Sequence, residues 1–215
     1  MVGGIRLKVC GLTTAADAAA AARIGADYLG FIVYPKSPRY LPLAAYQSLD
    51  LANLSAKRVA VTVEPTPAEL AELATAGFNF FQVHFRYDTP TETVGSWAET
   101  VGVQRLWLAP KLPPGTDYPE RLLPFARTVL FDAFDAEKFG GTGRTGDWEK
   151  YIRHRRLWPH LGWILSGGLG PTNVTEALAR TSAPWIDVNS GVESAPGQKD
   201  HAKLEALAAA LQARA

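Results

Sequence analysis

Residues 5–10 read Ile-Arg-Leu-Lys-Val-Cys, and Gly11 follows at once. Apolar and polar side chains alternate along this run, which predicts a β-strand. The run ends in Cys10, which is the single cysteine of the chain. Ligands of parallel α/β folds bind beyond the carboxyl ends of the strands. A thiol at this position therefore indicates an active-site residue.

Three later runs of the same kind also end in residues that can do chemistry. Thr-Val-Leu-Phe-Asp ends at Asp132, Ile-Leu-Ser-Gly-Gly-Leu-Gly covers residues 164–170, and Ile-Asp-Val-Asn-Ser-Gly covers residues 186–191. A carboxylate and two glycine-bearing loops thus follow strands in the same way as the thiol does. This combination is typical of an enzyme.

Strand-like and helix-like segments alternate along the whole chain. Strands are expected at residues 5–10, 27–33, 58–63, 79–84, 103–109, 127–132, 161–166 and 184–188, and helices at 14–24, 43–54, 67–76, 117–125, 147–156, 171–180 and 199–213. Eight strands, seven of them followed by a predicted helix and with no linker between the units, is the arrangement of a (β/α)8 barrel. A doubly wound open sheet is the competing architecture, and the count of eight disfavours it. The sequence predicts an α/β fold, a (β/α)8 TIM barrel that forms a single domain over residues 1–215.

Composition narrows the class of protein. The chain has 215 residues, of which 47% are hydrophobic, so it can bury one substantial core. Its 22 basic and 21 acidic residues give a net charge of +1, and we interpret the short basic run at 153–156 as the solvent face of a helix end. No nucleic-acid partner is therefore expected. Without a visible secretory signal or an apolar run of about 20 residues, we expect a cytoplasmic protein with no membrane partner.

The period of the first strand places Lys8 beside Cys10. Side chains alternate between the two faces of a strand, so these two point into the barrel while Leu7 and Val9 pack against helices. A nearby ammonium favours the thiolate, so we expect the pKa of Cys10 to lie below the ordinary value of about 8.5. The alternative is a buried structural cysteine, which is the commoner fate of a lone cysteine.

The same parity turns Asp132 inward, together with Leu130 and Thr128. Val129 and Phe131 then face outward. Aspartate is depleted in strands, so an inward carboxylate at the end of an apolar run is a candidate catalytic group. A helix cap or a loop hydrogen bond is the alternative role.

Glycines follow the last two predicted strands. Gly167 and Gly168 stand between the seventh strand and the next helix, and Asn189, Ser190 and Gly191 follow the eighth strand. Backbone N–H groups in such loops can converge on an anion, helped by the helix dipole. Phosphate sites of this barrel commonly combine the loops after strands seven and eight. These two loops are therefore the predicted phosphate site.

Two further side chains are candidates for the pocket. His84 ends the fourth strand with inward parity, and Arg39 follows the second strand as the best free cation for a substrate carboxylate. A solvated loop residue is the alternative for Arg39. His154, His160 and His201 are expected on the surface. The histidines show no spacing typical of a metal site, so no metal is expected.

Four segments of the chain, taken in order, resemble one known family. They are Lys-Val-Cys-Gly-Leu-Thr (8–13), Gly-Ala-Asp-Tyr-Leu-Gly-Phe-Ile-Val-Tyr-Pro-Lys-Ser-Pro-Arg-Tyr-Leu (25–41), Leu-Ser-Gly-Gly-Leu-Gly-Pro-Thr-Asn-Val (165–174), and Asp-Val-Asn-Ser-Gly-Val-Glu (187–193) with Pro-Gly-Gln-Lys-Asp-His (196–201). Together they closely resemble the phosphoribosylanthranilate isomerase family of tryptophan biosynthesis, and the resemblance covers the whole chain.

The resemblance implies a cofactor-free (β/α)8 barrel that catalyses the Amadori rearrangement of an aminoaldose phosphate to an aminoketose phosphate. It implies that Cys10 is the general base, Asp132 the general acid and Arg39 the partner of the anthranilate carboxylate. It further implies a substrate-binding role for Asp187 and a phosphate-binding role for Gly167, Gly168, Ser190 and Gly191. We also expect Lys8 and His84 to bind the substrate, and Gly143 and Asn189 to bind its phosphate. The expected partner is the small-molecule phosphosugar–anthranilate substrate, and the chain is expected to be a monomer or a homodimer.

Three stretches depart from the family pattern. Residues 82–86 read Gln-Val-His-Phe-Arg where the family has Gln-Leu-His-Gly, residues 146–148 read Gly-Asp-Trp where it has Phe-Asp-Trp, and residues 61–64 read Val-Thr-Val-Glu. Glu64 and Arg86 are therefore candidates for residues that set specificity.

Two other functions stay open at this point. One is a divergent phosphosugar isomerase, such as an enzyme for the histidine-pathway aminoaldose with two phosphates, although that related barrel has aspartate where Cys10 stands. The other is a non-catalytic phosphosugar-binding paralogue, which the intact Cys10 and Asp132 disfavour.

Overall fold

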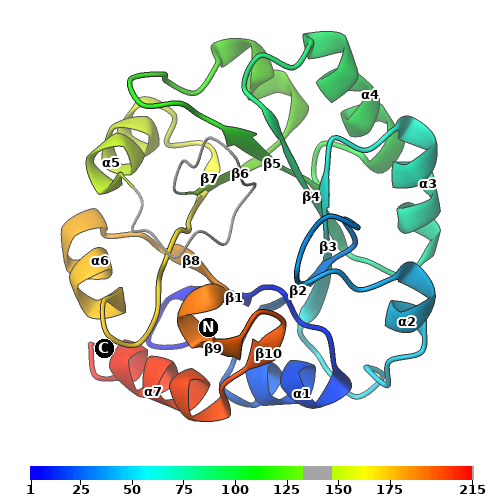
Figure 1. Cartoon of the computed structure of the whole chain (residues 1–215). Helices are drawn as coiled ribbons and strands as arrows, with labels where there is room; N and C mark the ends of the chain where they lie inside the picture. The colour runs from blue at the N-terminus through cyan, green and yellow to red at the C-terminus, as the bar shows by residue number, and fades with distance from the viewer. Residues whose placement is uncertain (133–146, 215) are drawn as a thin grey trace.

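Eight parallel strands close into a barrel in this computed structural model, and β8 pairs back onto β1 (Figure 1). The structure describes residues 1–132 and 147–214. The strands are β1 (Arg6–Val9), β2 (Tyr28–Ile32), β3 (Lys57–Val63), β4 (Phe80–Arg86), β5 (Leu106–Lys111), β6 (Thr128–Phe131), β7 (Gly162–Leu165) and β8 (Trp185–Val188). The predicted (β/α)8 fold is confirmed.

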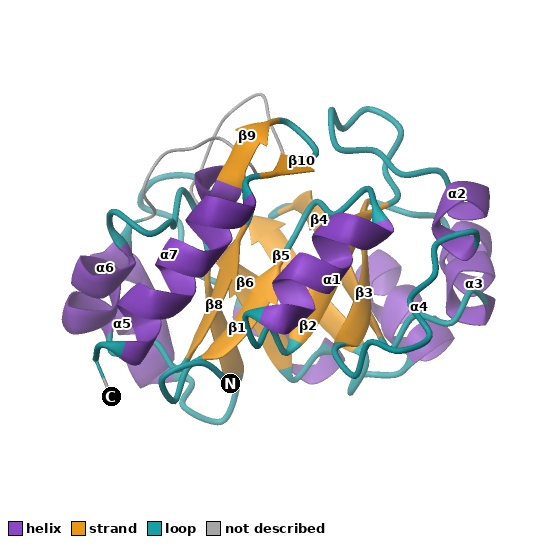
Figure 2. Cartoon of the chain, turned by 90° about the horizontal axis from the view of Figure 1, so that it is seen from below, coloured by secondary structure: helices purple, strands orange, loops and turns teal. Residues whose placement is uncertain are grey.

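Helices form a ring outside the barrel, as Figure 1 shows. They are α1 (Ala15–Arg23), α2 (Leu43–Gln47), α3 (Pro67–Thr75), α4 (Thr91–Val101), the 3-10 helix η1 (Glu120–Phe125), α5 (Trp148–Leu157), α6 (Val174–Thr181) and α7 (His201–Gln212). After β8, the 3-10 turn η2 (Ser190–Val192) leads into an antiparallel hairpin of β9 (Glu193–Ala195) and β10 (Gln198–Lys199). Figure 2 shows this hairpin beyond the barrel, at the end where the site is built.

Helix α4 lies outside every predicted helix range. Its sequence combines three threonines, Val94, Gly95 and Val101, which are poor helix formers. Its buried residues are Val94, Trp97, Ala98 and Val101, and their spacing forms one apolar stripe. Packing of that stripe against the core therefore stabilises the helix, whereas the intrinsic helix propensity of its residues does not.

Two predicted helices differ in length or type. The range 43–54 forms a helix only as far as Gln47, where Ser48 ends it and donates its hydroxyl to the carbonyl of Ala44. The range 117–125 forms a 3-10 helix that contains Pro124. Proline has no N–H to donate, which excludes the regular α-helical bond at that residue.

The strands divide their side chains between two apolar clusters, as the strand period predicts. Leu7 and Val9 belong to the large cluster between strands and helices, whereas Cys10 belongs to the cluster inside the barrel. Val129 and Phe131 likewise pack outward, and Leu130 lies inside. The predicted directions of the first and sixth strands are confirmed.

Aromatic rings fill the amino-terminal end of the barrel. The ring of Tyr28 stacks on Trp185 at 4.9 Å and meets Trp107 edge-on at 5.0 Å, and Phe80 lies 5.0 Å from Trp107. These rings stand at or near the first residue of their strands. They close the interior of the barrel at its amino-terminal end.

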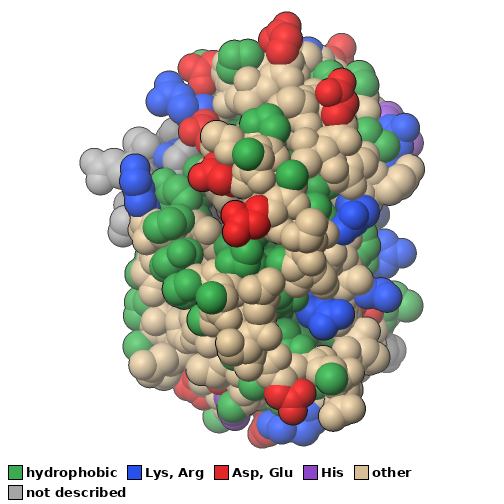
Figure 3. Space-filling view, turned by 90° about the vertical axis from the view of Figure 1, so that its right-hand side faces the viewer, with side chains coloured by type: hydrophobic (Ala, Val, Ile, Leu, Met, Phe, Trp, Pro, Cys, Tyr) green, Lys and Arg blue, Asp and Glu red, His purple; other side chains and the backbone are tan. Residues whose placement is uncertain are grey.

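Charged side chains of both signs occur on the face over α2, α3 and α4, where uncharged atoms separate them (Figure 3). Among the described residues, no helix combines the length and the hydropathy needed to cross a membrane.

Candidate active site

A cavity of about 580 Å³ opens at the carboxyl ends of the strands. Six of the residues predicted to form the site line it, namely Cys10, Arg39, His84, Asp132, Asp187 and Asn189. They come from loops or strand ends that are far apart in the sequence. The barrel therefore brings together the predicted thiol, both carboxylates, the arginine and the histidine.

Cys10 and Lys8 lie together inside the barrel, over Gly30 of β2. A Cβ added to Gly30 would lie 3.0 Å from Cys10 Sγ and 3.0 Å from Lys8 Nζ, so the glycine leaves room for both. Lys8 is fully buried, and its Nζ donates to Asp187 Oδ1 at 3.0 Å. Burial acts to lower the pKa of Lys8, but the charge of Asp187, together with the hydrogen bonds to Asp187 and Cys10, outweighs it and raises that pKa, so the lysine is an ammonium.

The expectation of a lowered pKa for the Cys10 thiol is wrong. Burial raises the pKa of Cys10 above its ordinary value. Lys8 opposes this effect, but Asp187 also acts to raise the pKa of the thiol. The free energy lost when a thiolate is removed from water exceeds the stabilisation by the Lys8 ammonium, whose charge Asp187 partly neutralises. Cys10 is therefore a thiol at neutral pH.

Asp132 follows β6 directly and lines the cavity. The neighbouring β7 fixes this strand end, because Ser166 N donates to Phe131 O at 2.9 Å. Strands β1 and β6 are not neighbours in the barrel. A thiol and a carboxyl group thus approach one cavity from separate parts of its wall.

Arg39 lines the cavity but is not the free cation that the sequence suggested. Its guanidinium is buried and paired with Glu193, to which Nε and Nη2 donate at 2.8–3.1 Å. Glu193 lies 154 positions away in the chain. The sequence therefore gives the loop and the residue type of Arg39, but not its charge partner.

His84 lies in the cavity wall beside Gln82, with its Nε2 at 2.8 Å from Gln82 Nε2. Burial, helped by the charge of Lys8, lowers the pKa of His84 to about 3, so the ring is neutral. The sequence analysis did not select Gln82 as a site residue. Its place two residues before an inward-facing histidine is the signal that identifies it.

The two glycine loops of the predicted phosphate site pack against each other. A Cβ at Gly191 would overlap the carbonyl oxygen of Leu169, so the loops approach backbone to backbone. Gly167 and Gly168 adopt φ of 99° and 61°, which favour glycine. Gly143 lies outside the described residues.

Helix α6 begins later than expected. The predicted range starts at residue 171, but the helix starts at Val174, with Asn173 as its N-cap residue. The Asn173 side chain accepts from Gly170 N at 2.9 Å and donates to Gly168 O at 2.9 Å. This side chain shapes the glycine loop, and the helix N-terminus stands a turn further on.

His154 is buried, so its predicted surface position is wrong. It packs on Trp163 with ring centroids 5.8 Å apart, and its Nε2 accepts from Tyr118 N at 3.2 Å. His160 and His201 are exposed as expected. Among the described residues, His, Cys, Asp and Glu side chains form no group of three that could hold a metal ion.

Glu64 and Arg86, the candidates for setting specificity, lie outside the lining of the cavity. Glu64 has φ of 43° and accepts from Arg86 N at 3.0 Å, so its carboxylate holds the end of β4. The Arg86 side chain is exposed and pairs with Asp88. Neither residue is among the described residues that line the cavity.

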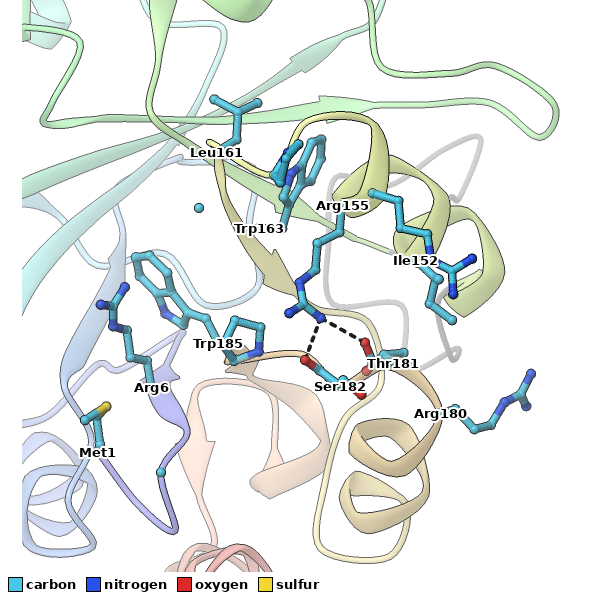
Figure 4. Close-up of a pocket in the computed structure, with 15 residues that line it drawn as sticks. Met1, Arg6, Ile152, Arg155, Leu161, Trp163, Arg180, Thr181, Ser182 and Trp185 are labelled. Carbon is cyan, nitrogen blue, oxygen red and sulfur yellow. Dashed lines mark hydrogen bonds between the residues drawn. The ribbon is translucent and has the colours of Figure 1, made fainter.

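A second cavity, of about 800 Å³, lies at the amino-terminal end of the barrel (Figure 4). Two of the arginines that line it have partners in the fold. Arg155 Nη1 donates to the carbonyls of Thr181 and Ser182 at the end of α6, and Arg180 points away toward Glu149. Cations at helix carboxyl ends complement the helix dipole. Arg155 and Arg180 thus have structural roles, and the predicted catalytic residues lie at the other end of the barrel.

The fold and the position of the first cavity place the chain among (β/α)8-barrel enzymes, whose active sites lie at the carboxyl ends of the strands. Residues 7–210 match the family described as N-(5'-phosphoribosyl)anthranilate (PRA) isomerase. A relative of that name from Synechococcus sp. strain JA-3-3Ab is 35% identical over 218 residues, which cover 99% of this chain and 93% of the relative. The chain belongs to the PRA isomerase family and is an isomerase.

Solved structures agree with this assignment. The phosphoribosyl anthranilate isomerase from Thermus thermophilus superposes with a TM-score of 0.80 at 30% identity, over 97% of this chain and 99% of that one. A second isomerase structure, in complex with reduced 1-(o-carboxyphenylamino)-1-deoxyribulose 5-phosphate, gives a TM-score of 0.75 at 29% identity, with 97% and 99% covered.

Proposed function

We propose that this chain converts N-(5'-phosphoribosyl)anthranilate to 1-(2-carboxyphenylamino)-1-deoxyribulose 5-phosphate in tryptophan biosynthesis, with Asp132 as general acid and Cys10 as general base. The observation that carries the assignment is that these two side chains line one cavity from non-neighbouring strands. An acid and a base on separate parts of the wall can act on different atoms of one small sugar.

Asp132 acts first. Its carboxyl group donates a proton to the furanose ring oxygen, and the bond between that oxygen and C1 breaks. The anilino nitrogen supplies the electron pair, which gives an open-chain Schiff base. The positive charge on this imine nitrogen makes the C2 proton acidic enough for removal by a side chain.

Cys10 then removes the C2 proton as the thiolate and leaves an enolamine, which tautomerises to the ketone. Lys8 and Lys199 both act to lower the pKa of Cys10 and favour the thiolate. Burial acts in the opposite direction and prevails. The reactive form of the base is therefore a minor species at neutral pH.

The remaining contacts hold the two negatively charged ends of the substrate. Arg39 pairs with the anthranilate carboxylate at the rim, and the loops at 167–168 and 189–191 take the phosphate. Support for the phosphate site comes from the backbone contact of these loops and the positive φ angles of Gly167 and Gly168.

The test is the loss of anthranilate-substrate fluorescence with purified protein. We expect saturable conversion that follows enzyme concentration. The proposal fails if the substrate disappears only at the uncatalysed rate, and a divergent function is supported if the aminoaldose with two phosphates is converted in its place.

We also infer that the chain works as a single cytoplasmic domain, either as a monomer or as a homodimer. The isomerase from Thermotoga maritima, 30% identical, is described as dimeric. Light scattering of the purified protein measures the mass of the particle, and a mass above that of two chains would contradict the inference.

A further inference from the structure

Glu193 is a buried carboxylate that gathers donors from three segments of the chain. It begins the hairpin strand β9 and is 7% exposed. Arg39, from the loop after β2, donates through Nε and Nη2. Lys199 Nζ, from β10, donates at 2.8 Å, and Gly197 N, from the turn between β9 and β10, donates at 3.2 Å.

The pairing uses one edge of the guanidinium. Nε and Nη2 of Arg39 both face Glu193, in the two-pronged geometry that arginine and carboxylate prefer. Nη1 has no hydrogen-bond partner among the described residues and remains for a ligand. Because Arg39 lines the cavity, this nitrogen belongs to the side chain that a substrate carboxylate would meet.

An arginine on a loop needs such a constraint to recognise a carboxylate well. Its long side chain has many rotamers, and each one that a ligand must exclude lowers the affinity. The turn at Gly197 also packs on the Arg39 backbone, since a Cβ added to this glycine would lie 3.8 Å from Arg39 Cα. The hairpin therefore fixes both the backbone and the side chain of Arg39.

We propose that Glu193 is a positioning residue for substrate recognition, which holds the guanidinium of Arg39 so that Nη1 meets the anthranilate carboxylate. Lys199 balances the charge of Glu193 and leaves the cluster with one net positive charge. This inference rests on the proposed function, in which Arg39 binds that carboxylate.

The test compares Lys199→Met with the double variant Glu193→Gln/Lys199→Met. Glu193→Gln alone would leave two buried cations without a carboxylate, which strongly destabilises a fold. The double variant removes one charge of each sign and avoids this problem. Lys199→Met is the matched control, because it keeps the pair of Arg39 and Glu193.

Two probes isolate the carboxylate. One is reduced 1-(o-carboxyphenylamino)-1-deoxyribulose 5-phosphate, and the other is the same compound without its carboxyl group. The ratio of their dissociation constants, measured by titration calorimetry, cancels any effect of Lys199 on the phosphate loop through Asn189, whose Oδ1 it contacts at 3.0 Å. Far-ultraviolet circular dichroism and thermal unfolding confirm that each variant is folded.

We expect the wild type and Lys199→Met to prefer the carboxylated probe by roughly 10- to 100-fold, the range of one charge-assisted contact. The double variant should lose most of this preference. Its ratio of dissociation constants for the two probes should approach the ratio measured for Arg39→Ala. A folded double variant with the full preference would overturn the role of Glu193 alone. A wild type without any preference would overturn the role of Arg39 and the inference with it, whereas failure to bind either probe would overturn the proposed function.

Discussion

Replacement of Cys10 by serine tests the base directly. The side chain is 4% exposed and lies against Gly30, so a hydroxyl of nearly the same shape fits the space. A hydroxyl gives up its proton far less readily than a thiol, so Cys10→Ser removes the base and leaves the wall of the cavity. Loss of one positioned base costs about 10²–10⁴ in rate, or roughly 3–5 kcal/mol of transition-state stabilisation. KM should change little.

The pH dependence of the wild type adds a second measurement. Only the thiolate can accept the C2 proton, and burial raises the pKa of Cys10 above its ordinary value. Below that pKa the thiolate fraction grows about tenfold for each pH unit. Turnover also needs Asp132 in its protonated form, so the thiolate is followed by alkylation with iodoacetamide, which reacts with the thiolate alone. We therefore expect the alkylation rate of Cys10 to rise with pH across the neutral range and to continue rising past about 8.5, the ordinary pKa of a thiol.

The assay is the fluorescence of the anthranilate substrate, followed from pH 6 to 9.5 for both proteins. Thermal unfolding and the affinity for the reduced product analogue serve as controls and should stay close to wild type. Cys10→Ser activity within about tenfold of wild type would refute the assignment. An alkylation rate of wild-type Cys10 that is flat across this pH range would refute the raised pKa of the thiol.

Three other changes test the rest of the site. Asp132→Asn keeps the shape of the side chain but has no acidic proton, so kcat should fall by about 10²–10⁴ while the reduced product analogue still binds. Near-normal turnover of this variant would show that another group is the acid. Gly168→Val places a branched side chain at φ 61°, which should abolish or greatly weaken phosphate binding in calorimetry, and unchanged affinity would remove the loop from the site. Asp187→Asn removes a charge that raises the pKa of Cys10 and frees Lys8 to favour the thiolate. The rise of the Cys10 alkylation rate should therefore move to lower pH, and a shift to higher pH would contradict the effect of Asp187 on the thiol.

Local periodicity accounts for what the sequence predicted well. The alternation along residues 5–10 is enough to send Lys8 and Cys10 into the barrel, because a strand has only two faces. The same rule places His84 and, from the end of β6, Asp132. Each of these predictions needs only neighbouring residues and the general rule that such barrels bind ligands at the strand ends.

Long-range pairing accounts for what the sequence did not predict. Arg39 and Glu193 are 154 positions apart, and no local pattern connects them. His154 reads as part of a charged run, yet tertiary packing against Trp163 buries it. Helix α4 was not predicted for a related reason, since its stability comes from the packing of an apolar stripe and not from helix-forming residues.

The pKa of Cys10 shows how the charges of the site act together. Lys8 was expected to favour the thiolate, but its charge is shared with Asp187, and burial of the thiol prevails. Lys8, Arg39 and Lys199 are three buried cations, and Asp187 and Glu193 are their two carboxylates. The loss of the proton from Cys10 would bring this group to neutrality, so the surrounding charges favour the reactive form even though desolvation opposes it. The barrel thus keeps a weakly acidic thiol in an environment whose net charge suits its thiolate, which is the requirement for a base that must be regenerated in every turnover.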